Sequence, residues 1–206
     1  MLAHRIPQGR KERNAANPVF ISMFTTETEL KTAADYAAMP DDGEQYELIA
    51  GEIIMVPPPT TFHQDILTIL IEQLGPLVRR RKLGKILPSP VNVFATEHDV
   101  YQPDLLFVRK DNLGIIHMDG VHGAPDFVIE ILSPSNAYYD LRLKKAVYEQ
   151  IGVREYWIVD PMERSIDCYE NSSNGFTATA AGKRTGRVCS SVIPEFCVEV
   201  EEVFSL

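Results

Sequence analysis

One acidic residue lies inside an otherwise apolar segment. Glu130 falls within Phe127–Leu132, whose other members are all apolar. Side chains alternate between the faces of a strand, so both faces of this segment are apolar and it is typical of an interior strand. A lone carboxylate there costs on the order of several kcal/mol unless it is paired, protonated or bound to a cation. Three alternatives stay open: a cation site, a structural ion pair, or a strand-end glutamate that reaches solvent before the break at Ser133-Pro134.

A cation site needs a second acid close to Glu130. Asp104 and Asp126 each follow a proline. Asp126 precedes Glu130 by four residues, roughly 13 Å along a strand, which is too far to share one ion. Asp104 opens a different apolar segment, Asp104–Val108. If the two strands are neighbours, about 4.8 Å apart, the carboxylates of Asp104 and Glu130 converge on one Mg2+. The alternative is a turn-forming aspartate after Pro103.

A lysine lies on the apolar side of a predicted helix. The pattern predicts a helix from about residue 138 to 151, which Gly152 ends. Successive helical residues turn by about 100°, so Lys144 falls on the apolar stripe and not on the polar face. We expect this stripe to pack on the strand of Glu130, which aims the Lys144 ammonium at the acids. Lysines on a buried face also bend to the edge, and that alternative stays open. The stripe consists of Val147, Tyr148 and Ile151.

Two further residues are candidates. Glu47 lies in a predicted hairpin, Tyr46–Met55, with Ala50-Gly51 as its turn. It is either an extra acid of the site or an exposed strand residue. His63 begins a predicted helix that runs to about Arg81, and it either assists at the site or makes local hydrogen bonds.

The order of elements predicts an α/β fold. Strands at 127–132 and 155–159 flank the helix at 138–151, and this crossover unit favours parallel pairing. The hairpin at 46–55 favours antiparallel pairing. We therefore expect a mixed β-sheet core flanked by helices, with extra β-hairpins.

Composition limits the function. The 206 residues predict one domain at 23–206 after a flexible basic extension at 1–22. No apolar run is long enough to span a membrane and no secretory signal is evident, which favours a cytoplasmic location. Three cysteines, an odd count, argue against disulfides and favour small buried residues. A net charge of −9 counts against sequence-blind coating of DNA. The basic residues between Arg79 and Lys85 either receive a nucleic-acid backbone or are the solvated end of a helix.

The combined pattern resembles the Uma2 (DUF820) family, a branch of the PD-(D/E)XK restriction-endonuclease-like nucleases. The resemblance spans about residues 30 to 170. The matching residues are Tyr46–Glu52, His63, Tyr101–Leu105, Glu130–Ser135, Asp140, Lys144, Tyr148 and Gly152–Asp160.

The resemblance implies a restriction-endonuclease-like core and a metal-dependent endonuclease acting on DNA, with 5′-phosphate and 3′-hydroxyl products and a homodimeric state. Asp104, Glu130 and the carbonyl of Ile131 would bind Mg2+ or Mn2+. The superfamily lysine is expected two residues after the glutamate, where Leu132 stands, so Lys144 would replace it. The alternatives are a catalytically inactive nuclease-fold protein that serves as a binding or assembly module, and a hydrolase of other phosphate esters.

Overall fold

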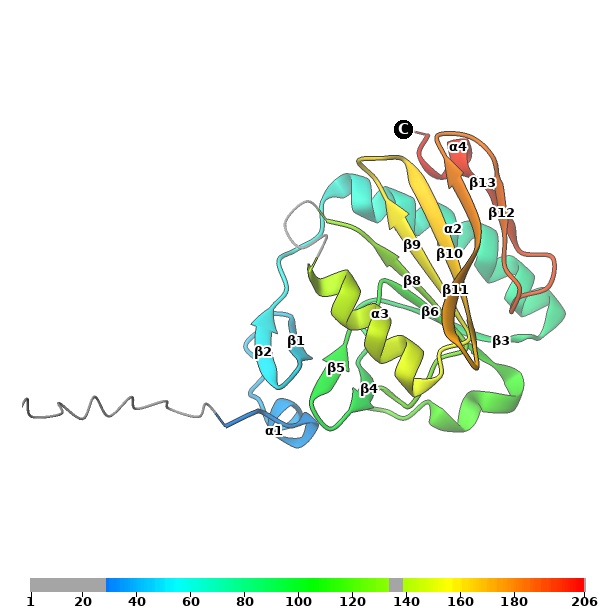
Figure 1. Cartoon of the computed structure of the whole chain (residues 1–206). Helices are drawn as coiled ribbons and strands as arrows, with labels where there is room; N and C mark the ends of the chain where they lie inside the picture. The colour runs from blue at the N-terminus through cyan, green and yellow to red at the C-terminus, as the bar shows by residue number, and fades with distance from the viewer. Residues whose placement is uncertain (1–28, 134–138, 206) are drawn as a thin grey trace, which may run out of the picture.

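A mixed six-stranded sheet forms the centre of the protein (Figure 1). The structure, a computed structural model, describes residues 29–133 and 139–205. The extension expected at 1–22 and the boundary expected at residue 23 lie outside this range. Within the sheet, β8 and β9 are parallel, as the sequence predicted, whereas the other neighbouring strands pair antiparallel. The order is β11 (Gly175–Lys183), β10 (Ser165–Ser172), β9 (Glu155–Asp160), β8 (Phe127–Ile131), β6 (Leu105–Arg109) and β3 (Gly84–Pro88).

A second sheet of five strands contains the predicted hairpin. Ala50 and Gly51 have φ values of 49° and 80°, the left-handed geometry of a two-residue hairpin turn. Its third strand, β5, pairs with β1 through Leu48 and Val100. The strands, in order, are β2 (Glu52–Met55), β1 (Tyr46–Ile49), β5 (Asp99–Tyr101), β4 (Val93–Thr96) and β7 (Val121–His122).

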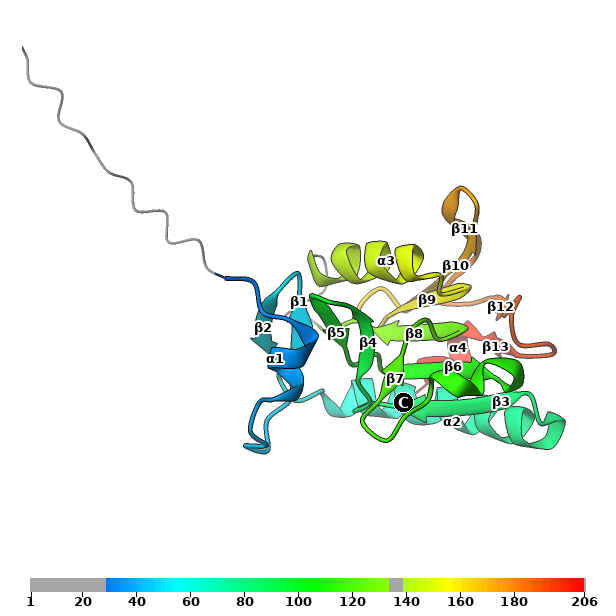
Figure 2. The ribbon, with the colours of Figure 1, turned by 90° about the horizontal axis from the view of Figure 1, so that it is seen from below.

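Two long helices cover opposite faces of the six-stranded sheet. Figure 2 shows α3 (Tyr139–Ile151) on one face and α2 (Thr61–Arg81) on the other. Alternation along β8 follows this division: Ile129 lies in the apolar core beneath α2, and Val128 in the core beneath α3. Because Glu130 alternates with Ile129, its side chain enters the α3 face. A short helix, α1 (Ala33–Ala37), begins with a capping box formed by Thr32 and Asp35.

The C-terminal segment contains a disulfide that the sequence did not predict. Strand β12 (Arg187–Cys189) pairs with β13 (Cys197–Glu199), and α4 (Val200–Val203) follows. The pairing places Cys189 directly opposite Cys197, and their sulfur atoms are bonded. The expectation of small buried cysteines holds for Cys168, which is buried and free, but is wrong for the other two. An odd count of cysteines therefore does not exclude a disulfide, because two of the three can pair and leave one free.

Other differences concern short elements. A 3-10 helix, η1 (Lys110–Ile115), follows β6 directly. The short strands β5 and β7 were not predicted. Strands of two or three residues are too short to show an alternating pattern. Among the described residues, no helix has the length and apolarity needed to cross a membrane.

Candidate functional site

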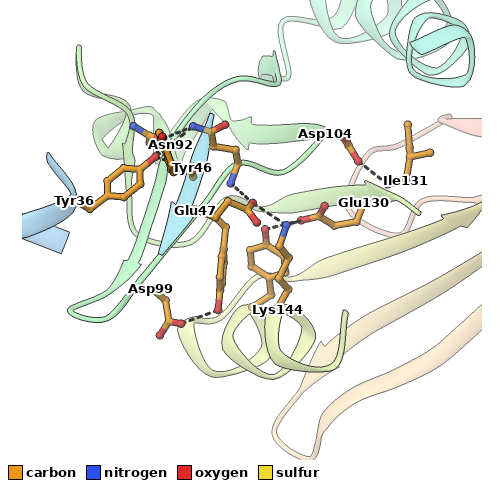
Figure 3. A network of polar contacts seen from close by, with 12 residues as sticks. Tyr36, Tyr46, Glu47, Asn92, Asp99, Asp104, Glu130, Ile131 and Lys144 are labelled. Atoms are coloured by element: carbon orange, nitrogen blue, oxygen red, sulfur yellow. Dashed lines mark hydrogen bonds and ion pairs between the residues drawn. The ribbon is translucent and has the colours of Figure 1, made fainter. Parts of the chain in front are cut away.

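The two predicted acids lie opposite each other on neighbouring strands. Strands β6 and β8 pair antiparallel with Leu105 opposite Ile129. One step outward, Asp104 therefore lies across from Glu130, as the sequence argument required. The Oδ2 atom of Asp104 accepts a hydrogen bond of 2.7 Å from the backbone N–H of Ile131. The backbone of β8 thus fixes the Asp104 carboxylate beside the segment that carries Glu130 (Figure 3).

Glu130 is buried, with 7% of its surface exposed, so the alternative of a strand end in solvent is wrong. Its Oε1 atom accepts a hydrogen bond of 2.9 Å from the Tyr148 hydroxyl and lies 3.5 Å from Lys144 Nζ. Burial raises the pKa of Glu130 to about 8, the Lys144 ammonium opposes that rise, and the charges of Asp104 and Glu47 add to it. Burial is therefore the main reason that Glu130 resists ionisation in this cluster.

Lys144 points inward from α3 and does not bend to the surface. It is 9% exposed, and its Nζ donates a hydrogen bond of 2.8 Å to Glu47 Oε1. The ammonium also lies 5.6 Å from the centre of the Tyr101 ring. Burial by itself lowers the pKa of Lys144, but the carboxylates of Glu130 and Glu47 outweigh it and raise the pKa above the ordinary lysine value. The ammonium therefore stays charged at neutral pH.

Glu47 belongs to the same buried cluster. It was expected either at the site or on an exposed strand, and the structure buries it at 5% exposure on β1. Its Oε1 atom accepts hydrogen bonds from Lys144 and from the backbone N–H of Gln102, each at 2.8 Å. Figure 3 shows Glu47 and Glu130 on either side of Lys144. The five-stranded sheet thus contributes one acid to a cluster otherwise carried by the six-stranded sheet and α3.

His63 reaches the cluster from the other face of the sheet. Its backbone N–H makes the expected local hydrogen bond with Thr60 Oγ1 at 3.2 Å, yet its ring Nε2 lies 3.2 Å from Asp104 Oδ1. Burial lowers the pKa of His63, but the hydrogen bond and charge of Asp104 and the carbonyl of Ile131 outweigh that effect, so the pKa is raised. His63 therefore stabilises one oxygen of Asp104 while the Ile131 N–H binds the other.

A polar network beside the cluster was missed from the sequence. The Asn92 Oδ1 atom accepts hydrogen bonds from Gln102 Nε2 at 2.9 Å and from the Tyr36 hydroxyl at 3.0 Å. The Tyr101 hydroxyl donates to Asp99 Oδ1 at 2.8 Å. These bonds fix the residues just before Pro103-Asp104, and Figure 3 shows them flanking the acids. Tyr36 and Asn92 gave no sequence signal because their partners lie ten or more residues away in the chain.

Several other candidates lie elsewhere. Asp126 accepts hydrogen bonds from the Arg109 N–H at 2.9 Å and from Asn112 Nδ2 at 3.0 Å, at the opposite end of β8 from Glu130. It is therefore structural, as the distance argument predicted. His122, at the end of β7, pairs with Asp119 at 3.0 Å.

The basic residues at 79–85 are also far from the acids. They follow His63 by 16 residues or more along α2, roughly 24 Å. Arg81 moreover pairs with Glu195 at 2.6 Å. Of the two alternatives for this basic segment, the structure favours the solvated end of a helix.

The cluster offers oxygen donors of the kind that bind small divalent cations. The carboxylates of Asp104, Glu130 and Glu47 face one lysine, and burial, with a smaller contribution from the charges of Asp104 and Glu47, raises the pKa of Glu130. A bound cation would favour the ionised form of Glu130. Among the described residues, no group of three or more His, Cys, Asp and Glu side chains is arranged to hold a metal. A set of two carboxylates and one main-chain carbonyl, completed by water, is nonetheless how proteins commonly bind Mg2+.

Comparison with known proteins relates this arrangement to one family. The profile of the Uma2 family, described as “Putative restriction endonuclease”, matches residues 33–201. A crystal structure described as “a putative nuclease belonging to DUF820”, from Anabaena variabilis, superposes with a TM-score of 0.70. Its sequence is 18% identical, and the match covers 84% of this chain and 97% of that one. No curated protein matches the chain.

Proposed function

The chain belongs to the Uma2 family, whose description is “Putative restriction endonuclease”, and we propose that it is a metal-dependent endonuclease acting on DNA. One observation carries the proposal: Asp104 and Glu130 lie opposite each other, with the buried ammonium of Lys144 beside them. The nuclease-like fold of the structural neighbour is consistent with it.

We infer that Asp104, Glu130 and the carbonyl of Ile131 bind Mg2+ or Mn2+. When bound, such an ion polarises a phosphodiester and lowers the pKa of a coordinated water. Asp104 is prepared for this role because the Ile131 N–H and His63 fix its carboxylate. Glu130 is held by Tyr148 on the side that faces Lys144.

Among the chain's own residues beside the acids, Lys144 supplies positive charge. An ammonium has three donors, and one of them is bound to Glu47 at 2.8 Å. The ammonium also lies 3.5 Å from Glu130 Oε1, and we propose that it orients an attacking water or offsets charge on the phosphate in the transition state. Glu47 thus positions Lys144, and His63 positions Asp104. The products expected from the family resemblance are a 5′-phosphate and a 3′-hydroxyl.

The position of Lys144 bears on whether activity is retained. Leu132 stands where the superfamily lysine is expected, and its N–H continues the strand pairing to Val159 at 2.8 Å. Lys144 reaches Glu130 from the following helix instead. A lysine delivered from α3 restores the charge that Leu132 lacks, which supports an active enzyme.

DNA cleavage tests the proposal directly. We expect the wild type to cut supercoiled or linear DNA with Mg2+ or Mn2+, and EDTA to abolish cutting. Asp104→Asn, Glu130→Gln and Lys144→Met should each lower the rate at least 100-fold. Lys145→Met is the matched control, because the neighbouring Lys145 lies over the Tyr169 ring and away from the acids. Equal cutting by all variants, or cutting that persists in EDTA, would refute the assignment.

A second candidate function is an inactive nuclease fold that serves as a binding or assembly module. One observation favours it: Oδ2 of Asp104 and Oε1 of Glu130 already accept hydrogen bonds from the chain, so the cluster is partly satisfied without a cation. Calorimetric titration with Mn2+ separates the two. An enzyme should bind Mn2+ in a manner that Asp104→Asn abolishes, whereas a closed structural cluster should give no heat of binding.

The family resemblance also predicts a homodimer. Light scattering after size-exclusion chromatography tests this, because the chain mass is 23.2 kDa and a dimer has twice that mass. A single species at the chain mass, at any concentration tested, would contradict it. The cytoplasmic location stays a prediction that fractionation of the native cells tests.

A further inference from the structure

Two arginines share a hollow at one edge of the six-stranded sheet. Arg164 lies in the turn between β9 and β10, and Arg184 directly follows β11. The backbone N–H of Arg184 donates a hydrogen bond of 2.7 Å to the carbonyl of Arg164, which fixes the two turns together. The hollow has a volume of about 280 Å3, and its other lining residues are Met162, Glu201 and Phe204. Both arginines therefore lie on turns that a backbone hydrogen bond joins.

The charges of these arginines are not neutralised by ion pairs. Across residues 29–133 and 139–205, arginine ion pairs are formed by Arg81, Arg109, Arg154 and Arg187, and neither Arg164 nor Arg184 takes part in one. The carboxylates nearest to them have other partners.

Glu163, although near enough to Arg184 for their charges to interact, is paired with Lys183. The Oε2 atom of Glu201 accepts a hydrogen bond from the Gly186 N–H at 3.1 Å. The hollow thus offers two guanidinium groups to an anion.

The hollow lies at the end of the sheet where β8 and β9 finish, which is also the end that carries the acidic cluster. Strands β8 and β9 are parallel, with Glu130 opposite Ile158, so both strands end at one edge. The turn that carries Arg164 starts just beyond Asp160, and Figure 1 shows it at the top of the molecule near α4. Two strand spacings and a few residues separate Glu130 from Arg164, roughly 15 Å.

We propose that Arg164 and Arg184 bind a backbone phosphate of the nucleic-acid substrate, a few nucleotides from the bond at the acids. This inference rests on the proposed nuclease function. A chain with a net charge of −9 and an acidic cluster repels nucleic acid, so cations beside the cluster are needed to hold the substrate. Guanidinium groups bind phosphate through paired N–H donors. The exposed Met162 gives the sugar an apolar surface at the rim.

The salt dependence of DNA binding tests this contact. The Glu130→Gln chain, which should bind without cutting, is titrated into a labelled duplex of about 20 base pairs at several KCl concentrations. Each phosphate contact contributes roughly 0.9 to the slope of log affinity against log salt. The added double substitution Arg164→Gln/Arg184→Gln should lower the slope by about 1 to 2 and the low-salt affinity about tenfold or more. Arg79→Gln/Arg80→Gln, on the exposed end of α2, is the matched control and should change neither.

A second readout separates binding from chemistry. In the otherwise wild-type chain, the double substitution should leave the hydrolysis of bis(p-nitrophenyl) phosphate unchanged, because this substrate is too short to reach the arginines. Arg164→Lys/Arg184→Lys keeps both charges and should retain most of the salt slope, which guards against a folding defect in the glutamine variant.

Three results would overturn the inference. An unchanged slope in the glutamine variant, with thermal melting like that of its parent, would refute the contact alone if the wild type cuts DNA. An equal loss in the Arg79/Arg80 control would also refute it, because the effect would then be general electrostatics. A wild type that neither binds nor cuts DNA would overturn the contact together with the proposed function.

Discussion

The carboxylate of Asp104 accepts a hydrogen bond of 2.7 Å from the backbone N–H of Ile131, the residue that follows Glu130. The two acids are therefore set relative to each other by a strand backbone and not only by side-chain packing. Since His63 binds the second oxygen of Asp104 from α2, the carboxylate is held from two sides. A carboxylate that is already fixed loses little conformational entropy when it binds a ligand. Such preorganised groups stabilise charge more effectively than mobile ones.

Removing the ammonium should destabilise the protein. In Lys144→Met, the buried carboxylates of Glu47 and Glu130 lose their cation, so we expect the free energy of unfolding to fall by about 3–5 kcal/mol. Adding Glu130→Gln should recover part of that loss, because one charge is removed. Urea denaturation at pH 7.5 with EDTA, followed by the fluorescence of Trp157, measures both. Lys145→Met, which loses a contact with a tyrosine ring, should cost no more than about 1 kcal/mol, and parity between the two lysines would contradict the prediction.

The raised pKa of Glu130 predicts a pH dependence of stability. Between its ordinary value of 4.5 and about 8, the folded chain binds more protons at Glu130 than the unfolded chain does. The contribution of Glu130 to the free energy of unfolding therefore falls as pH rises through this window. Glu130→Gln lacks this loss, so its stability relative to the wild type should grow from pH 5 to 8 and level off above. Thermal melting in EDTA across this range measures the difference, and a constant difference would sink the prediction.

The hydroxyl of Tyr148 should tune metal binding. It donates to Glu130 and holds the pKa of that carboxyl down, so Tyr148→Phe should raise this pKa further. We expect Mn2+ binding at pH 7 to weaken several-fold and its pH midpoint to move upward, with near-normal binding at pH 9, as titration calorimetry can measure. Tyr156→Phe is the control, because the buried Tyr156 hydroxyl has no hydrogen-bond partner among the described residues. A shift of equal size in the control would mean that the effect is packing.

The disulfide predicts a stability change under reduction. Cys189 and Cys197 are separated by 8 residues in sequence, so their disulfide closes a short loop. Loss of this disulfide should lower the free energy of unfolding by about 2–3 kcal/mol. Cys189→Ser/Cys197→Ser should show this loss, and the oxidised wild type should lose a similar amount in dithiothreitol. The double variant itself should be insensitive to the reductant. Stability that does not respond to the reductant in either protein would show that the bond contributes nothing.

The central parts of this fold and site could be predicted from local pattern. Lys144 was placed on the buried face of α3 because helical spacing groups it with Tyr148, and it is 9% exposed. The pairing of Asp104 with Glu130 needed only that two apolar strands be neighbours, which the register bears out. Their metal-binding and catalytic roles stay predictions.

Features that depend on distant contacts could not be predicted. The four residues of β1 do not reveal which face is covered, and Glu47 is buried because Lys144 and Gln102 approach it from elsewhere in the chain. The same applies to the Asn92 network and to the cross-strand disulfide. The basic residues near Arg79 were conspicuous in sequence, but helix length alone carries them far from the acids.

Because Lys144 lies on α3 and not on β8, its position depends on the docking of the helix as well as on the pairing of the strands. A lysine on β8 would be positioned as soon as the sheet paired, whereas Lys144 reaches Glu130 only when the helix packs against that face. An intermediate with its strands paired and α3 still undocked would hold both acids without their counter-charge. Completion of the charge balance therefore requires docking of α3, and we expect substitution of Val147 or Ile151 on its apolar stripe to disturb the position of Lys144.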